Sequence, residues 1–228
     1  NNGGNGELIN AVVAVIGTGS DATFRTDYWA FTLGPLVPDE RRIIDDFESD
    51  LAQGADSNGN LIGFFTFQGA GSSVAISNPA TPPAPVLPAV GTPNRAMQVD
   101  VNVTSFAGFI HAFENPAVDA WVTQNWSNSE GISLWLYGTG SGTSLFIDIL
   151  DNRNPGSTQD DAERFTVTFR DDFVGWQRLE FPFSSFTRKE IGNGAPNDGL
   201  GLFQMHGWAF GTLGTGSART YYMDEVSL

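Results

Sequence analysis

The segment spanning residues 202–210 combines an aromatic side chain with hydrogen-bonding side chains at strand spacing. In an extended strand, Gln204, His206 and Trp208 point to one face, and Met205 points to the opposite, core-facing side. Sugar rings present apolar C–H faces and polar edges, so a sugar-binding surface needs flat aromatics beside donors and acceptors. We therefore predict a carbohydrate platform here. The alternative is that Trp208 packs beneath a loop or the N-terminal segment.

Composition excludes several other classes of function. The chain has 228 residues, 40% of them hydrophobic, which indicates a globular protein with a sizeable core. Its formal net charge of −15 opposes binding to nucleic acid and to anionic membranes. The absence of cysteine removes disulfides, thiolate metal sites and cysteine nucleophiles. The longest apolar run, residues 11–16, is too short to span a bilayer.

Short alternating segments separated by turn residues predict the fold class. In residues 96–103, Met97, Val99 and Val101 share one face, and residues 132–137 alternate in the same way. The aromatic segment 175–186 is a further strand, and Pro182 marks its end or an edge of a sheet. Because no helical period is sustained, we expect an all-β protein, a two-sheet antiparallel β-sandwich. Residues 1–42 are expected to be an N-terminal extension or linker packing on a main domain of residues 43–228.

Five landmarks recur in a fixed order along the main domain. They are Ile-Asp-Asp-Phe-Glu at 44–48, Trp126, Asp-Ala-Glu-Arg-Phe at 161–165, the 176–186 segment and Tyr-Met-Asp-Glu-Val at 222–226. In this order the chain resembles the family 11 carbohydrate-binding modules of the galactose-binding-like superfamily, over about residues 43–228. The resemblance implies a β-jelly roll whose concave sheet face binds a β-glucan chain, and a structural calcium. Assembly factors of respiratory complex I share this domain style, so the fold alone does not decide function.

The resemblance also places candidate ligand contacts. Phe106 and Phe65 fall where the family has tyrosines, and phenylalanine keeps the stacking surface but lacks the hydroxyl. Asp161 matches an aspartate of the family, and Lys189 stands where the family has an arginine. Two further contacts of the family are replaced here by Ile191 and Gly192. The departures weaken the implied preference for mixed-linkage β-glucan.

A second aromatic group and a metal site are also possible. Trp135 and Tyr137 share the outer face of their strand, where they either extend the platform or lie under aromatics of the extension. In the resembled family a calcium ties the first strand to the last. Asp46, Glu48 and Asp224 are the corresponding candidate ligands, since calcium takes carboxylate and carbonyl oxygens. The alternative is that they are ordinary solvated carboxylates.

Three functions follow from these observations. The first is a non-catalytic carbohydrate-binding module that targets a secreted bacterial glycoside hydrolase, covalently linked to it, to a β-glucan-type polysaccharide. The second is a structural or interaction β-sandwich of a surface or multidomain protein, without glycan binding. The third is a jelly-roll glycosidase or lyase, for which Asp160, Asp161 and Glu163 are the best carboxylate cluster. We favour the first, outside the cell or on its surface.

Overall fold

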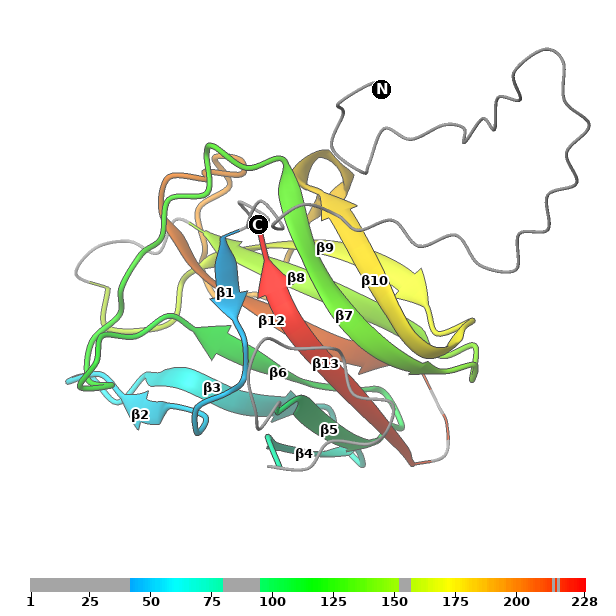
Figure 1. Ribbon diagram of the computed structural model, residues 1–228. Helices are drawn as coiled ribbons and strands as arrows, with labels where there is room; N and C mark the ends of the chain where they lie inside the picture. Colours follow the sequence, from blue (N-terminus) through cyan, green and yellow to red (C-terminus); the bar gives the residue numbers. More distant parts are fainter. Residues whose placement is uncertain (1–41, 80–94, 152–156, 215, 217) are drawn as a thin grey trace, which may run out of the picture. The chain divides into compact units, whose positions relative to one another are not determined.

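The computed structural model describes residues 42–79, 95–151, 157–214, 216 and 218–228, and this part of the chain folds into two antiparallel sheets (Figure 1). One sheet has six strands, in the order β10-β7-β13-β5-β4, with β1 also paired to β13. Its strands are β1 (Ile43–Asp45), β4 (Ser73–Ser77), β5 (Met97–Asn102), β7 (Gly131–Thr139), β10 (Val174–Pro182) and β13 (Arg219–Ser227). The short 3-10 helix η2 (Phe183–Ser185) follows β10.

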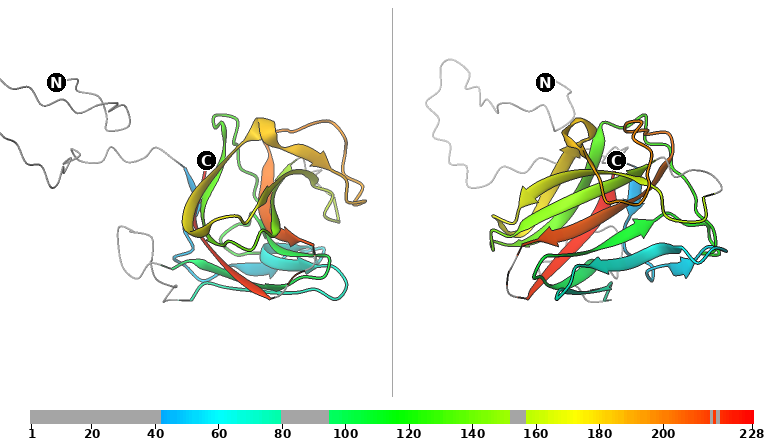
Figure 2. Two further views of the ribbon diagram at one scale, coloured as in Figure 1. Left: turned by 90° about the vertical axis from the view of Figure 1, so that its right-hand side faces the viewer. Right: turned by 180° about the vertical axis from the view of Figure 1, so that it is seen from behind.

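The second sheet has seven strands, in the order β11-β9-β8-β12-β6-β3-β2. Its strands are β2 (Gln53–Ala55), β3 (Leu61–Gln68), β6 (Phe106–Ala112), β8 (Ser144–Asp151), β9 (Glu163–Arg170), β11 (Thr187–Lys189) and β12 (Met205–Leu213). The side view in Figure 2 shows the two sheets as separate layers, with β13 in one and β12 in the other. The predicted all-β sandwich is confirmed.

The core lies between the sheets and follows the predicted alternation. Met97, Val99 and Val101 are buried, while Gln98, Asp100 and Asn102 between them are not. The inward residues of β7, Ile132, Leu134 and Leu136, are buried as well. Apolar side chains on the inner faces of both sheets are buried against one another, away from water. This burial is the main stabilising contribution in such a fold.

The aromatic 175–186 segment forms β10 and η2 at the edge of the six-stranded sheet. Pro182 is the last residue of β10, as its missing N–H requires. Phe181 packs across the core on Phe169 of the other sheet, with ring centroids 5.0 Å apart. Phe183 and Phe186 extend the same buried cluster beyond the strand.

The beginning and end of the described domain are paired. β1 runs antiparallel to β13, with Ile43 opposite Ser227. The predicted extension lies outside the described residues except for Arg42, so its packing stays a prediction. In the described part of the chain, no helix has the length and hydrophobicity needed to cross a membrane.

Candidate functional site

Trp208 lies in the core, so the predicted platform on its strand is wrong. Its side chain has 0% exposure, and its ring packs edge-on against Phe109. The cause is a register shift between Met205 and Gly207 in the pairing of β12 with β8. An extra residue in a strand reverses the alternation that follows it, so Met205 and Trp208 both face the core although they are three residues apart. This irregularity cannot be read from the periodicity.

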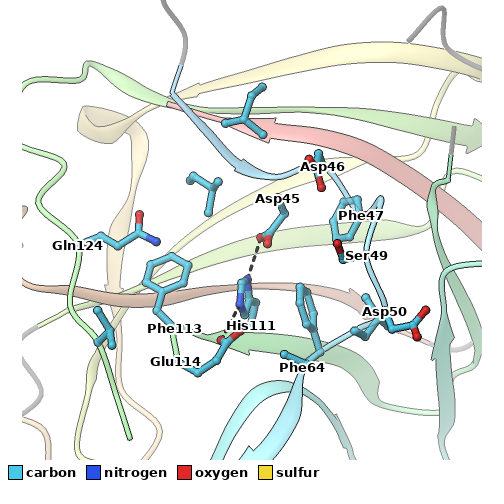
Figure 3. A pocket seen from close by; sticks show the side chains of 15 residues that line it. Asp45, Asp46, Phe47, Ser49, Asp50, Phe64, His111, Phe113, Glu114 and Gln124 are labelled. Atoms are coloured by element: carbon cyan, nitrogen blue, oxygen red, sulfur yellow. Dashed lines mark hydrogen bonds and ion pairs between the residues drawn. The ribbon is translucent and has the colours of Figure 1, made fainter. Parts of the chain in front are cut away.

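A buried hydrogen-bond network explains why an indole is tolerated at this position. Asp45 Oδ2 accepts a hydrogen bond from Trp208 Nε1 at 2.6 Å and lies 2.8 Å from His111 Nδ1. The other ring nitrogen of His111, Nε2, lies 3.0 Å from Glu114 Oε2 (Figure 3). Burial alone would lower the pKa of His111, but the two carboxylates outweigh burial and raise this pKa to about 9. His111 is therefore an imidazolium at neutral pH.

Asp45, His111 and Glu114 of this network line a pocket of about 530 Å³ (Figure 3). The pocket lies between the chain that leaves β1 and the end of β6. The His111 ring stacks on Phe64 at 3.9 Å and meets Phe113 edge-on at 5.1 Å. Because the polar atoms of Asp45 and His111 already bond to one another and to Trp208, we assign this network to holding β1 against the seven-stranded sheet.

The outer face of the seven-stranded sheet carries a different set of aromatics. Directly opposed residues of antiparallel strands point to the same side. One row across this face contains Phe67, Gly108, Gly211 and Phe146 in β3, β6, β12 and β8. The two glycines in the middle leave room for the flanking rings. A Cβ on Gly211 would lie 2.2 Å from Phe146 Cζ, and one on Gly108 would lie 2.7 Å from Phe67 Cζ.

The two flanking rings therefore lie over bare backbone, where Phe67 is half-buried and Phe146 is buried with 2% exposure. Phe67 and Phe146 have centroids 6.2 Å apart, and Phe106 lies 6.3 Å from Phe67. Phe106 is 42% exposed, so it presents its ring to solvent. At the other end, Lys189 Nζ lies 4.1 Å above the centroid of Phe146 and bonds to Asp148 Oδ2 at 2.7 Å. We call Phe106, Phe67, Phe146, Lys189 and Asp148 the phenylalanine strip.

The next row of the same face supports this strip. Phe65, Ile110, Ala209 and Asp148 are opposed across β3, β6, β12 and β8. Phe65 is half-buried and packs on a small apolar cluster with Ile110 and Ala209, separate from the sandwich core. Trp121 contacts the same cluster. The outer face thus has an apolar surface of its own, which is unusual for the solvent side of an antiparallel sheet.

Three of the seven predicted carbohydrate contacts come together on this face: Phe106, Phe65 and Lys189. His206 is buried and meets Trp121 edge-on at 5.7 Å, while Gln204 is exposed in the turn before β12. Asp161 is buried two residues before β9 begins. Sequence reasoning missed Phe67, Phe146, Asp148 and Trp121. Two signals in the sequence could have indicated this face. Phe65 and Phe67 are two residues apart and so point to the same side of their strand, and glycines occur on the neighbouring strands.

The second aromatic group, Trp135 and Tyr137, cannot extend the phenylalanine strip. Trp135 and Tyr137 lie on β7 of the six-stranded sheet, and the strip lies on the outer face of the seven-stranded sheet. Tyr137 packs edge-on against Trp176 at 5.5 Å and against Tyr222 at 6.2 Å. The aromatics that were predicted to cover this group lie outside the described residues.

The predicted calcium ligands are not gathered around one point. Among the described residues, no group of three or more His, Asp or Glu side chains is arranged to hold a metal ion. Both carboxylate oxygens of Glu48 accept the backbone N–H of Arg95, at 3.1 and 3.2 Å. Asp46 Oδ1 accepts the backbone N–H of Glu48, and Asp224 Oδ1 accepts that of Glu225. These three side chains therefore do not fit the expected calcium site as a set.

Two of the three carboxylates considered for catalysis are bound to arginines. Asp160 Oδ2 accepts a hydrogen bond from Arg164 at 2.7 Å, and Glu163 is fully buried and pairs with Arg188. A glycosidase needs two carboxyl groups facing a substrate, one of them able to donate a proton. A fully buried Glu163 held by a guanidinium meets neither need.

Comparison with known proteins identifies the family and agrees with the fold. The family model described as a carbohydrate binding domain (family 11) matches residues 32–228. The family 11 module from Clostridium thermocellum, solved in complex with a beta-1,3-1,4-mixed-linked tetrasaccharide, is similar at TM-score 0.57 and 18% identity. That match covers 82% of this chain and 94% of the other. No curated protein matches the chain.

Two further solved structures have the same fold. The family 11 module of the cellulosomal cellulase Lic26A-Cel5E of Clostridium thermocellum has a TM-score of 0.56 at 18% identity, covering 82% of this chain and 93% of that one. A family 30 carbohydrate-binding module has a TM-score of 0.51 at 12% identity, covering 81% and 84%. The antiparallel sandwich is the fold of these carbohydrate-binding modules. The chain belongs to family 11 of these domains, which are non-catalytic.

Proposed function

We propose that the chain binds a neutral β-glucan-type chain along the phenylalanine strip. The observation that carries this proposal is the pair of accessible rings, Phe106 and half-buried Phe67, on the outer face, backed by buried Phe146 over Gly211. Phe106 and half-buried Phe67, with ring centroids 6.3 Å apart, offer neighbouring stacking positions for the apolar faces of sugars, and buried Phe146 packs beside Phe67. The family 11 relative with a bound tetrasaccharide supports the same class of ligand.

The residues of the strip have distinct roles in this proposal. Phe106, the exposed ring, stacks on the ligand, and half-buried Phe67 continues the surface. Lys189 donates hydrogen bonds to sugar hydroxyls, and Asp148 holds the ammonium in place across the ring of Phe146. Because the strip offers phenyl rings without hydroxyls, its specificity depends on few hydrogen bonds. We therefore expect moderate affinity and tolerance of different β-linked glucans.

We further propose that the domain acts outside the cell or on its surface, in a bacterium, as the targeting part of a longer enzyme. One structural relative is the module of a cellulosomal cellulase, which supports a covalently linked glycoside hydrolase here. The strongly negative charge fits a neutral polysaccharide better than an anionic one.

Affinity electrophoresis in gels containing mixed-linkage β-glucan, xyloglucan, xylan or galactomannan tests the proposal. Wild-type protein should be retarded by the β-glucan gel. Phe106→Ala and Phe67→Ala remove stacking surface worth roughly 1 kcal/mol each, so each should weaken binding about five- to tenfold.

Two variants serve as controls. Val174→Ala trims an apolar side chain of 80% exposure on β10 of the other sheet, and Trp208→Phe changes a buried core ring and removes its hydrogen bond to Asp45, away from the strip. Folded protein of both should bind as the wild type does. If the wild type binds none of these polysaccharides although an unfolding curve shows that it is folded, the alternative of a structural or interaction domain without glycan binding is favoured. Equal binding by the Phe106, Phe67 and Val174 variants would remove the strip from the site.

A further inference from the structure

A basic pocket lies at one end of the sandwich, although the protein has a formal net charge of −15. Its volume is about 240 Å³, and it is formed where β5, β9 and β12 end and where β8 and β13 begin. Two arginines, Arg170 and Arg219, line it, and its described lining residues include no aspartate or glutamate. The local charge of this pocket is therefore opposite to that of the molecule as a whole. We call it the arginine pocket.

These two arginines differ from most basic residues of the described domain. Five others each form an ion pair with a carboxylate, namely Arg95, Arg164, Arg178, Arg188 and Lys189. The hydrogen bonds of Arg170 and Arg219 go instead to backbone carbonyls, of Gly142 at 2.8 Å and of Ala218 at 3.1 Å. In the described part of the chain neither arginine has an ion pair. Because a guanidinium carries several N–H donors, both side chains keep donors for a ligand.

Arg219 is turned toward the space between the sheets. In β13 it has the same parity as Tyr221 and Met223, which are buried in the core. It is also directly opposed to Val101 of β5, which is buried as well. A guanidinium at the end of the core without a carboxylate partner leaves its charge to be balanced by water or by a ligand.

The carboxylate next to the pocket is occupied elsewhere. Asp171 follows Arg170 and is fully buried. Its oxygens accept hydrogen bonds from Thr139 and Ser141, and Oδ2 also accepts one from the hydroxyl of Tyr221. Burial would raise the pKa of Asp171, but the hydrogen bonds from Ser141 and Thr139 outweigh burial and lower this pKa. The acceptor positions of Asp171 are therefore taken by neutral donors.

We propose that the arginine pocket binds the carboxylate of an acidic sugar, a uronic acid unit carried by an otherwise neutral polysaccharide. A planar guanidinium matches a carboxylate with two parallel hydrogen bonds, and two guanidinium groups balance its charge. Ser144, directly opposed to Arg170, adds a hydroxyl, and Val103 and Leu213 add apolar surface for the C–H groups of the sugar.

The size of the pocket and the charge of the protein restrict this ligand. A volume of about 240 Å³ is below the roughly 300–1,000 Å³ of sites for larger small molecules, so the pocket suits a single sugar unit. The net charge of −15 repels a polyanion, which favours isolated carboxylates on a neutral chain. The proposal rests on membership of a carbohydrate-binding family and goes beyond the function proposed for the phenylalanine strip.

Amide NMR titration of the whole labelled chain tests this proposal, with methyl β-glucuronide as the ligand and methyl β-glucoside as its neutral counterpart. Only the glucuronide should shift the amides around Ser144, Arg170 and Arg219. Arg170→Gln and Arg219→Gln should each weaken its binding about tenfold or more, because each removes charge-assisted hydrogen bonds. Arg178→Gln is the matched control, since it removes the same charge from β10, where Arg178 lies 3.4 Å from Glu180. It should bind the glucuronide as the wild type does.

Two further comparisons make the outcome decisive. Phe67→Ala, which weakens the proposed strip, should leave the glucuronide shifts unchanged, so the two proposals can fail separately. The proposal is overturned if glucuronide and glucoside cause the same shifts, or if either folded pocket variant binds the glucuronide as tightly as the wild type. Inorganic sulfate that binds the pocket as tightly as the glucuronide would also overturn it, because the sugar would then contribute nothing.

Discussion

His111 is the residue with the most consequential electrostatic environment in the domain. Its imidazolium lies between Asp45 and Glu114, and the Asp45 carboxylate also accepts the indole N–H of Trp208. The network joins β1, β6 and β12, which come from the two ends and the middle of the domain. The protonated form of His111 therefore helps to hold β1 in place.

The stability of the domain should depend on pH through His111. Its pKa is raised from 6.5 to about 9 on folding, so the contribution is fully present below pH 6.5 and is lost as the pH rises through 9. The raised pKa corresponds to roughly 3 kcal/mol of unfolding free energy. Urea denaturation across this interval measures the loss.

Glu114→Gln provides the control for this dependence. It removes one of the two carboxylates that favour the imidazolium, so the folded-state pKa of His111 falls and the loss of stability should begin at lower pH. A wild-type unfolding free energy that stays level between pH 6.5 and 9 would show that His111 is neutral in the fold. An unchanged profile in Glu114→Gln would show that Glu114 does not favour the imidazolium.

At the scale of the elements, glycines on β6 and β12 determine the shape of the candidate site. Gly211 has an ordinary negative-φ backbone, so its role is to make space rather than to permit an unusual conformation. All three atoms nearest to a Cβ at this position belong to the ring of Phe146. A methyl group on Gly211 would therefore displace that ring from the sheet.

Gly211→Ala should weaken polysaccharide binding and reduce stability by roughly 1–3 kcal/mol through overpacking. Adding Phe146→Leu should restore part of the stability, because the smaller side chain relieves the clash, but should not restore affinity. Gly216→Ala is the matched control, since a Cβ at Gly216 meets nothing within 4 Å. Calorimetric titration measures the affinity, and chemical denaturation the stability, of the wild type and the three variants. Wild-type affinity and stability in Gly211→Ala would contradict this prediction.

The sequence predicts single elements well where one face is regularly buried. The alternation of Met97, Val99 and Val101 determines which side of β5 faces the core, and Pro182 correctly marks the end of an edge strand. It fails on β12, because the register shift before Gly207 reverses the faces of everything that follows, Trp208 included. Local patterns do not report the pairing of distant strands, so such a shift is visible only in three dimensions.

For the whole molecule, the fold class follows from composition, strand spacing and the ordered landmarks, and the structure confirms the two-sheet sandwich. The site was only partly predictable. Phe106, Phe65 and Lys189 were placed through the resemblance, whereas Phe67 and Phe146 become neighbours only when β3, β6, β12 and β8 are aligned. The proposed binding face is made by β3, β6, β12, β8 and β11, so it depends on the order of these strands, which no single stretch of sequence contains.

The central claim is that the outer face of the seven-stranded sheet binds the ligand. The most direct test is an amide NMR titration of the labelled domain with a β-1,3-1,4-linked glucose tetrasaccharide. We predict the largest shifts along β3, β6 and β8 around Phe67, Phe106 and Phe146, and on β11 at Lys189. Largest shifts around the pocket of Asp45 and His111, or on the six-stranded sheet, would contradict the account.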